Sequence, residues 1–326
     1  MKRFRQLCVF VCTAVLFVAA TGSTAYAVVP GENGRILFTR CVWRGDCTWE
    51  IVAADPDGSD EVVLAGPYPR EAWDDHFTAN WSPDGETAIF MAYQVIWQVN
   101  ADGTHLRKIW QPPTKRTGID DGPSFTPDGE HIVFTRCCPR VSGYALWMIN
   151  AYGTGLRQVT DESVPPGVDG PSDNLPQVSP DGTRIAYHRN VVTCPDPSDC
   201  GNRIVTVNID GGDRTRLTPP SLDAQVPNWS PDSKRVVFIM FPPSGGIEVG
   251  IVRADGTHLH QLTHSGKFVS VWPSFSPDGS KIIFSRSMPG GWVGLFTMNP
   301  DGSDVTLISR HARADNWPQW AAARSA

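Results

Sequence analysis

Charged residues are scarce in this sequence, making up 19% of the chain against roughly 25% in typical globular proteins. Lys and Arg total 28 and Asp and Glu total 34, which leaves a net charge of −6 at pH 7. Because binding to a nucleic-acid backbone depends on an excess of Lys and Arg, this balance argues against DNA or RNA as a partner. The 40% hydrophobic content argues against a disordered chain, since it is enough to build a core.

The sequence motifs of several common enzyme classes are missing. There is no Gly-Xaa-Ser-Xaa-Gly, no phosphate-binding loop and no His-Glu-Xaa-Xaa-His, the usual motifs of α/β-hydrolases, P-loop proteins and zinc proteases. No Cys-Xaa-Xaa-Cys occurs either, although a four-cysteine zinc site normally contains such pairs. The only long apolar run lies near the N-terminus, so we expect no membrane-spanning segment in the rest of the chain.

The N-terminal segment predicts export. Three basic residues within the first five positions precede an apolar run from Leu7 to Ala20, and small residues follow up to Ala27. This layout is typical of a secretory signal peptide over residues 1–27, with an uncleaved signal anchor as the alternative. Cleavage would leave residues 28–326, with a net charge of −9 after loss of the three basic side chains. We expect this mature chain to be a monomer that is secreted or held in the cell envelope or periplasm.

Gly (30) and Pro (28) are abundant and recur in a repeated motif. The motif is a large apolar residue followed by Ser or Thr, Pro, Asp and, in most copies, Gly, and it recurs every 44 to 53 residues. Its copies begin at Trp81, Phe125, Val178, Trp229 and Phe275, and a shortened copy ends at Trp320. A second motif with the pattern Asn-Xaa-Asp-Gly, as in 100–103, lies between successive copies. The chain therefore contains six units of about fifty residues.

Each unit contains four short runs that are typical of β-strands. In the unit of Trp81 these runs are 78–82, 87–91, 95–100 and 106–110. Pro and Gly of the first motif suit a tight turn between the first two strands, and Asp-Gly of the second suits a turn between the last two. Four antiparallel strands in each of six units predict an all-β fold, a six-bladed β-propeller.

The two ends of the chain are expected to close this ring. Residues 34–40 match a second strand without a first, and 317–320 match a first strand without a second. Pairing them would complete one blade and remove an exposed sheet edge. One copy of the first motif has Ser233 in place of Gly, so we expect a left-handed backbone there and a gain of about 1 kcal/mol in stability from Ser233→Gly.

The repeat resembles that of a known family. The Trp-Ser-Pro-Asp-Gly motif, the Ile-Xaa-Phe after it and the Asn-Xaa-Asp-Gly-Ser/Thr turn are similar to the propeller repeat of TolB-like proteins. The resemblance covers nearly all of the mature chain. Prolyl-oligopeptidase-like enzymes carry the same repeat, but this sequence lacks both their hydrolase domain and the N-terminal domain of TolB. The resemblance thus implies a fold, whereas function resides in sites built on that fold.

Binding is expected on one rim of the ring. We call the rim that carries the two repeated turns the turn rim and the opposite one the variable rim. The variable rim would contain segments that differ between units, namely 41–47, 66–80, 112–122, 137–144, 161–177 and 194–200. Loops held by a rigid scaffold commonly carry binding sites.

The innermost strands add candidate residues through the alternation of side chains along a strand. The residue before the large apolar residue of the first motif should face the central channel and is polar in every unit: Asn80, Ser124, Gln177, Asn228, Ser274 and Gln319. Four positions earlier, at the expected channel mouth, are His76, Asp120, Asp173 and Asp315, with Asp121, Asn174, Gln225 and Asn316 as neighbours.

Three of these residues, Asp120, Asp173 and Asp315, have carboxylates that could bind a hard cation such as Ca²⁺ or a cationic group of a partner. The alternative is that each Asp accepts hydrogen bonds from nearby backbone and shapes its loop. No other cofactor is indicated.

Six cysteines remain after cleavage, an even number that predicts disulfides in an exported protein. Cys41 with Cys47 and Cys194 with Cys200 each span a short insert and are the expected pairs. The adjacent Cys137 and Cys138 are open between a mutual bridge, bridges to other loops and free thiols.

Two functional hypotheses follow. The first is a secreted, non-enzymatic propeller that binds a protein, peptide or cell-envelope component through the variable rim and channel mouth. The alternative is a secreted polysaccharide lyase or hydrolase that uses the three Asp residues and His76, since such chemistry requires only two placed acids.

Overall fold

The structure, a computed structural model, describes residues 30–44, 46–68, 79–113, 120–137, 143–161, 171–192, 194, 196, 200–266, 268–308 and 314–323. For residues 43, 44, 46, 47, 120, 137 and 314 it describes the backbone but not the side chain. The expected signal peptide, residues 1–27, lies outside this range. His76 and Cys138 lie outside it as well.

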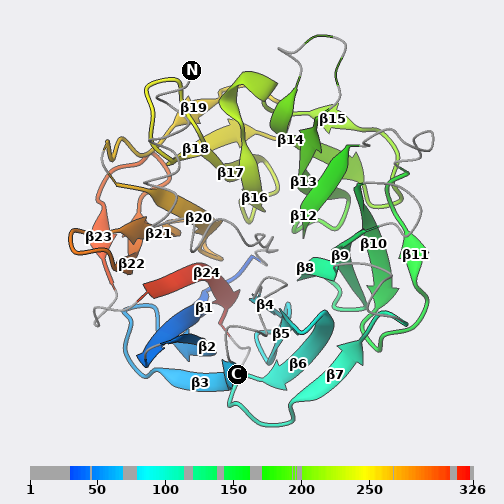
Figure 1. The fold of residues 1–326 in the computed structure, drawn as a ribbon, viewed down its shortest axis with the longest axis vertical. Helices are drawn as coiled ribbons and strands as arrows, with labels where there is room; N and C mark the ends of the chain where they lie inside the picture. Colours follow the sequence, from blue (N-terminus) through cyan, green and yellow to red (C-terminus); the bar gives the residue numbers. More distant parts are fainter. Residues whose placement is uncertain are drawn as a thin grey trace.

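Six four-stranded antiparallel blades form a closed ring, as the repeats predict (Figure 1). From the innermost strand outward, the first three blades are β4 (Ala79–Trp81), β5 (Thr87–Ala92), β6 (Val95–Asn100) and β7 (Arg107–Trp110); β8 (Asp120–Phe125), β9 (His131–Cys137), β10 (Tyr144–Asn150) and β11 (Arg157–Gln158); β12 (Ser172–Val178), β13 (Arg184–Val191), β14 (Gly201–Asn208) and β15 (Thr215–Arg216).

The remaining blades are β16 (Gln225–Trp229), β17 (Arg235–Met240), β18 (Glu248–Arg253) and β19 (His260–Gln261); β20 (Ser270–Phe275), β21 (Ile282–Ser287), β22 (Val293–Met298) and β23 (Thr306–Leu307); β24 (Ala314–Ala322), β1 (Asn33–Arg44), β2 (Asp46–Ala54) and β3 (Val62–Tyr68). A single 3₁₀ turn, η3 (Pro220–Leu222), is the only helical element in the described residues.

The core lies between blades. Val237 and Val249 of the fourth blade pack in one cluster with Phe275 and Phe284 of the fifth, and all four are buried. Because each sheet packs against its neighbours with both faces, the second strands begin with a continuous apolar run, which in β17 extends over five buried residues in a row. Burial on both faces explains why these strands lack a simple polar and apolar alternation.

The sixth blade joins the two ends of the described chain (Figure 1). β24 pairs antiparallel with β1, and the Trp320 indole donates a hydrogen bond of 2.8 Å to the Gly34 carbonyl. The predicted closure is therefore confirmed. The expected variable insert 41–47 differs from the prediction, since β1 and β2 extend through most of it as paired strands.

Five innermost strands contain a β-bulge that the repeats did not predict. In each, the residue before a proline has a positive φ, between 51° and 62°: Gly122, Leu175, Val226, Trp272 and Trp317. The ladder with the second strand shifts by one residue at the same place. A bulge reverses the alternation of side chains beyond it, which affects the prediction for the channel mouth.

Candidate functional site

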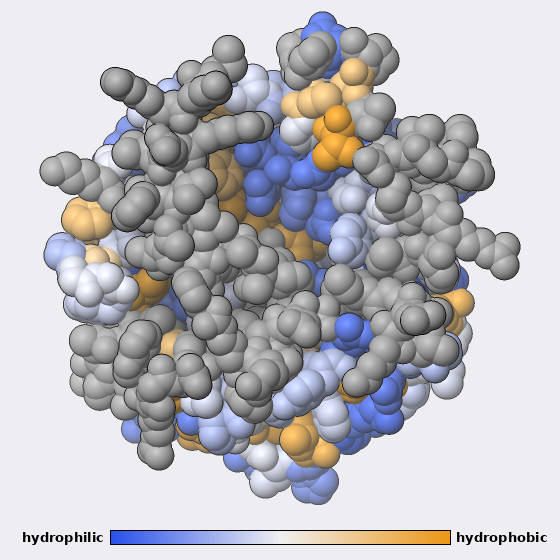
Figure 2. Space-filling model, viewed as in Figure 1, coloured by the Kyte–Doolittle hydropathy of each residue, from blue (hydrophilic) through white to orange (hydrophobic). Residues whose placement is uncertain are grey.

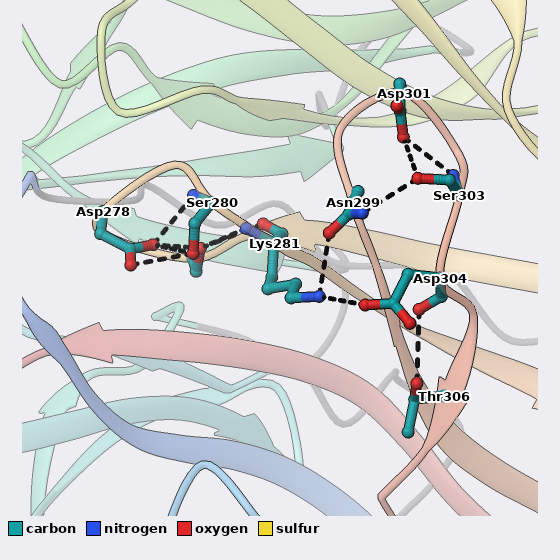
Figure 3. Close-up of polar contacts among 9 residues, drawn as sticks. Asp278, Ser280, Lys281, Asn299, Asp301, Ser303, Asp304 and Thr306 are labelled. Carbon is teal, nitrogen blue, oxygen red and sulfur yellow. Dashed lines mark hydrogen bonds and ion pairs between the residues drawn. The ribbon is translucent and has the colours of Figure 1, made fainter.

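Aspartates of the turn rim are engaged in building the turns. In the fifth blade, Asp278 accepts a hydrogen bond of 2.7 Å from the Ser276 hydroxyl. It accepts another of 2.8 Å from the Ser280 hydroxyl (Figure 3). Nearby, the Lys281 ammonium donates to Asn299 at 2.9 Å and pairs with Asp304 at 2.8 Å (Figure 3). These side chains satisfy one another and the turn backbone.

Titration of these carboxylates follows from the same bonds. Partial burial raises the pKa of Asp278, but hydrogen bonds from Ser276 and Ser280 outweigh it and lower the pKa below the ordinary 3.8. Asp301, in the second motif, has a lowered pKa because Ser303 donates to it from hydroxyl and backbone. Asp278 and Asp301 therefore have a structural role in their turns.

Glycine is required in some turns for two reasons: the backbone has a positive φ, and a side chain would clash with the neighbouring blade. Gly211 has φ +97°, and a Cβ added to it would overlap the Val159 carbonyl oxygen of the preceding blade. Ser233 has φ +57°, which confirms the predicted left-handed backbone. Its hydroxyl accepts a hydrogen bond of 3.1 Å from the Asp181 backbone in the third blade. The turn rim is thus a set of contacts between blades.

On the variable-rim side, Asp315 of β24 forms a buried ion pair with Arg40 of β1. The Arg40 Nε lies 2.7 Å from Asp315 Oδ1, and the two side chains are 3% and 1% exposed. Arg40 also donates two hydrogen bonds to Glu61. Burial lowers the pKa of Arg40, but the bonds to Glu61 and Asp315 outweigh it and raise the pKa above its usual value. The negative charge of Asp315 is therefore balanced by the Arg40 guanidinium.

The negative charge of Asp173 of β12 is balanced by arginine in the same way. Arg189 of β13 donates to its Oδ1 at 2.8 Å, and Arg214 lies 3.8 Å from its Oδ2. The Asp173 side chain is fully buried. Asp120 is in register with Arg136 of β9, although the side chain of Asp120 lies outside the described residues.

The prediction that the side chains of Asp173 and Asp315 lie on the same face of the strand as the channel-lining residues is wrong, because a bulge intervenes. Asp173 pairs with Arg189 while Gln177 pairs with Ala186, three residues away on β13, so Asp173 and Gln177 are on opposite faces of the sheet. The same shift separates Asp315 from Gln319 in β24. One extra residue in each strand is the physical reason.

The six expected channel-lining residues are polar and buried rather than solvated. Their exposed fractions are at most 1%: Asn80, Ser124, Gln177, Asn228, Ser274 and Gln319. Two pairs connect neighbouring blades, because Gln319 donates to Asn80 at 2.7 Å and Asn228 donates to Gln177 at 3.0 Å. Their amides therefore join blades around the axis.

The neighbours of the expected mouth residues are hydrogen-bonded within the protein, three of them to residues one or two positions away. Asp121 accepts a bond of 2.6 Å from the Gly122 backbone, and Asn174 donates to the Ser172 carbonyl at 3.1 Å. Gln225 donates to Asp223 at 3.4 Å, and the Asn316 carbonyl accepts from Thr39 at 3.3 Å. These contacts agree with the alternative in which polar residues shape the loops.

A cation at the mouth would have to compete with arginines for Asp173 and Asp315. Within the described residues, one group of three potential metal ligands occurs, Asp128 with Glu130 and His131. It belongs to the turn rim, where Asp128 already accepts bonds from Thr126 and the Glu130 backbone. Among the side chains that the structure describes, neither place offers a set of unengaged oxygen ligands of the kind that Ca²⁺ prefers.

Cysteine pairing agrees with the prediction where it is described. Cys194 and Cys200 form a disulfide across the loop between β13 and β14. Cys41 is also disulfide-bonded, whereas the side chain of Cys47 lies outside the described residues. The side chain of Cys137 and all of Cys138 lie outside them too, so their chemistry stays a prediction.

Exposed apolar side chains are found on the variable rim in several blades. Tyr93 is 49% exposed between β5 and β6, Val192 is 60% exposed after β13, and Phe268 is 37% exposed before β20. One face of the ring is hollowed at its centre, where hydrophobic and hydrophilic residues both form the wall (Figure 2). Apolar groups on a polar rim are typical of surfaces that bind other molecules.

Comparison with known proteins supports the family resemblance. Residues 172–325 match the TolB β-propeller domain. An uncharacterised Agrobacterium fabrum protein is 26% identical over 171 residues, or 50% of this chain and 54% of its own length. The Tol-Pal system protein TolB of Anaeromyxobacter dehalogenans is 28% identical over 140 residues, or 41% of this chain and 29% of its own length. The chain therefore matches about half or less of each relative.

A solved structure with the same fold is that of TolB from Acinetobacter baumannii. It superposes with a TM-score of 0.70 at 19% identity, over 90% of this chain and 68% of that chain. No helix in the described residues is long and apolar enough to cross a membrane. The chain is thus a closed six-bladed β-propeller whose sequence and fold are similar to the propeller of TolB.

Proposed function

We propose that the protein is an exported, non-enzymatic binding protein whose variable rim holds a protein or peptide of the cell envelope. The observation that carries this proposal is that the turn rim repeats the same turns and contacts between blades, whereas the loops of the variable rim differ between units and expose Tyr93, Val192 and Phe268. The relationship to a Tol-Pal system protein supports an envelope partner. The N-terminal segment supports export.

Catalysis is disfavoured by the engagement of the acids. A lyase or glycosidase needs one carboxyl group as an acid and another as a base or nucleophile. Asp173 and Asp315 each form an ion pair with an arginine, at 2.8 and 2.7 Å, which accounts for their presence as structural residues. The described acids therefore fit a structural role better than proton transfer.

The test compares the two rims. The chain 28–326 is incubated with envelope extract of the source organism and cross-linked, and captured proteins are quantified by mass spectrometry. Replacing Tyr93, Val192 and Phe268 together by Ser should reduce capture of the specific partner at least tenfold. The matched control is Tyr152→Ser, because Tyr152 is 79% exposed on the turn rim.

Two outcomes would contradict the proposal. Capture that falls equally in the control and the rim variant would place the contact elsewhere. Turnover of an envelope glycan by the same preparation, lost in Asp173→Asn, would favour the enzymatic alternative. Melting temperatures of all variants establish that any loss does not reflect unfolding.

A further inference from the structure

Arginine recurs at one position of the second strand in four blades. These residues are Arg40, Arg136, Arg189 and Arg286, and the residues in register with them on the innermost strands are Asp315, Asp120, Asp173 and Ser270. In the first and fourth blades, the position that corresponds to these arginines is Ala92 or Met240. The position that corresponds to the aspartates, four residues before the channel-lining Asn80 or Asn228, is not acidic in either blade. Arginine and aspartate thus occur together, and the fifth blade alone has the arginine without the aspartate.

Arg286 has a weaker partner than its counterparts. Its Nε donates a hydrogen bond of 3.0 Å to Ser270 Oγ, whereas Arg40 and Arg189 form ion pairs at 2.7 and 2.8 Å. Within the described part of the chain, the two terminal nitrogens of Arg286 have no hydrogen bond or ion pair. A serine side chain is shorter than aspartate and carries no charge, so the guanidinium lacks the anion found in the third and sixth blades.

Glu248 of the neighbouring blade is the carboxylate that acts on Arg286 at longer range. It accepts bonds from the Thr263 hydroxyl at 2.6 Å and from the Ser265 backbone and hydroxyl, each at 2.8 Å. It is 2% exposed and forms no ion pair with Arg286. Glu248 therefore holds the loop after β19 and does not replace the missing aspartate.

The guanidinium of Arg286 is held in place and partly desolvated. It lies over the rings of Phe284 and Phe296, 4.9 and 5.4 Å from their centroids. Burial lowers the pKa of Arg286, and the Glu248 charge only partly opposes this. A positioned and partly desolvated guanidinium gains more from a bidentate anion than a freely hydrated one does.

We propose that the terminal nitrogens of Arg286 bind a carboxylate group of the partner, which takes the place of the aspartate that pairs with the arginine in the third and sixth blades. Ser270 is buried and its hydroxyl donates to Ser265 at 3.4 Å, so it positions Arg286 through the bond to Nε. Ser270 begins β20 at its variable-rim end, beside β21 (Figure 1). The exposed Phe268 is two residues away, so an acidic residue next to an apolar one matches this surface. This inference rests on the proposed binding function and names the chemistry that the rim recognises.

Nuclear magnetic resonance of the Arg286 side chain provides the test, with acetate as the probe. The Nε–H resonance is assigned by its absence in Arg286→Lys and followed as sodium acetate replaces sodium chloride at constant ionic strength. We expect a saturable shift with an apparent Kd on the order of 10 mM. A shift no larger than that in chloride, or a larger one with phosphate than with acetate, would overturn the proposal.

Ser270→Asp is the decisive variant because it restores the pair seen in the third and sixth blades. It should reduce acetate binding at least tenfold while the melting temperature stays equal or rises. Arg286→Gln should also lose the acetate dependence, measured on nearby backbone amides. Binding that persists in Ser270→Asp would exclude this site. Because acetate requires no partner protein, a negative result here is distinct from failure of the cross-linking test.

Discussion

The turn rim and the variable rim are built by the same repeats but differ in what their polar groups contact. On the turn rim, Asp278 and Asp301 bind the hydroxyls and backbone of their own turns. Toward the variable rim, Asp173 and Asp315 bind arginines of the second strand, and the loops differ between units. A repeat therefore keeps one rim for assembly and leaves the other free to differ between units.

The largest expected effect concerns close packing at the turn rim. Gly211→Ala should lower the free energy of unfolding by about 4 kcal/mol, because the new Cβ meets the Val159 carbonyl and φ is +97°. Gly245, on the variable rim, has φ +88° and nothing within 4 Å of an added Cβ, so Gly245→Ala should cost only about 1 kcal/mol. Urea unfolding measures both, and equal costs would break the comparison between rims.

The next effect concerns buried and exposed ion pairs. Asp315→Asn should destabilise by roughly 3 kcal/mol because it leaves Arg40 buried with one carboxylate partner fewer. On the turn rim, Asp213 pairs with Arg184 at 3.0 Å but is 69% exposed, so Asp213→Asn should cost under about 1 kcal/mol. Chemical denaturation of the two variants compares them directly. A smaller loss in Asp315→Asn than in Asp213→Asn would contradict the assignment.

A third prediction concerns the pH dependence of stability, which should differ between the buried His188 and the turn-rim Asp278. Burial lowers the pKa of His188 from 6.5 to about 3, so the unfolded chain takes up a proton in this range while the folded one does not. Stability from this residue is complete above about pH 6.5 and falls as the pH decreases toward 3. In His188→Gln, the free energy of unfolding should therefore fall by roughly 2 kcal/mol less between pH 6 and pH 4 than in the unchanged protein.

The control for this titration is Asp278→Asn. Asp278 has a pKa lowered below 3.8, so its contribution is present above that value and is lost as the pH falls further. This variant should alter the pH dependence only below about pH 4. Unfolding curves collected across the pH range measure both variants, and an unchanged slope in His188→Gln would refute the role of His188.

The smallest effect is expected at Ser233. Glycine would relieve the left-handed backbone by about 1 kcal/mol, but it would also remove the bond from the Asp181 backbone to the hydroxyl, a loss of similar size. Ser233→Gly should therefore be nearly neutral, rather than stabilising as the sequence alone suggested. Ser233→Ala keeps the strain and loses the bond, so it should cost about 1 kcal/mol in thermal unfolding. A full gain in Ser233→Gly would mean that the bond contributes nothing.

The candidate site was only partly predictable. The polar residues before each motif, such as Gln177 and Asn228, were found from their position, but their bonds between blades required neighbouring sheets to be placed together. Arg40 and Arg189 were missed, although Phe-Thr-Arg at 38–40 and 134–136 and Tyr-His-Arg at 187–189 occupy the same point of the repeat. These arginines occur in units that also have an Asp four residues before the channel-lining residue, and this joint occurrence was the available sequence signal for the ion pairs.

The sequence by itself determined the number of blades, the turns and the closure of the ring. These depend on local patterns, since Pro and Gly restrict the backbone at the positions where they stand and each unit repeats them. Only the tertiary structure decided which groups meet. The bulge before each proline reverses the side-chain phase, and Arg40 and Asp315 are 275 residues apart in the chain. Contacts of that kind depend on strand register and ring closure, which no local pattern encodes.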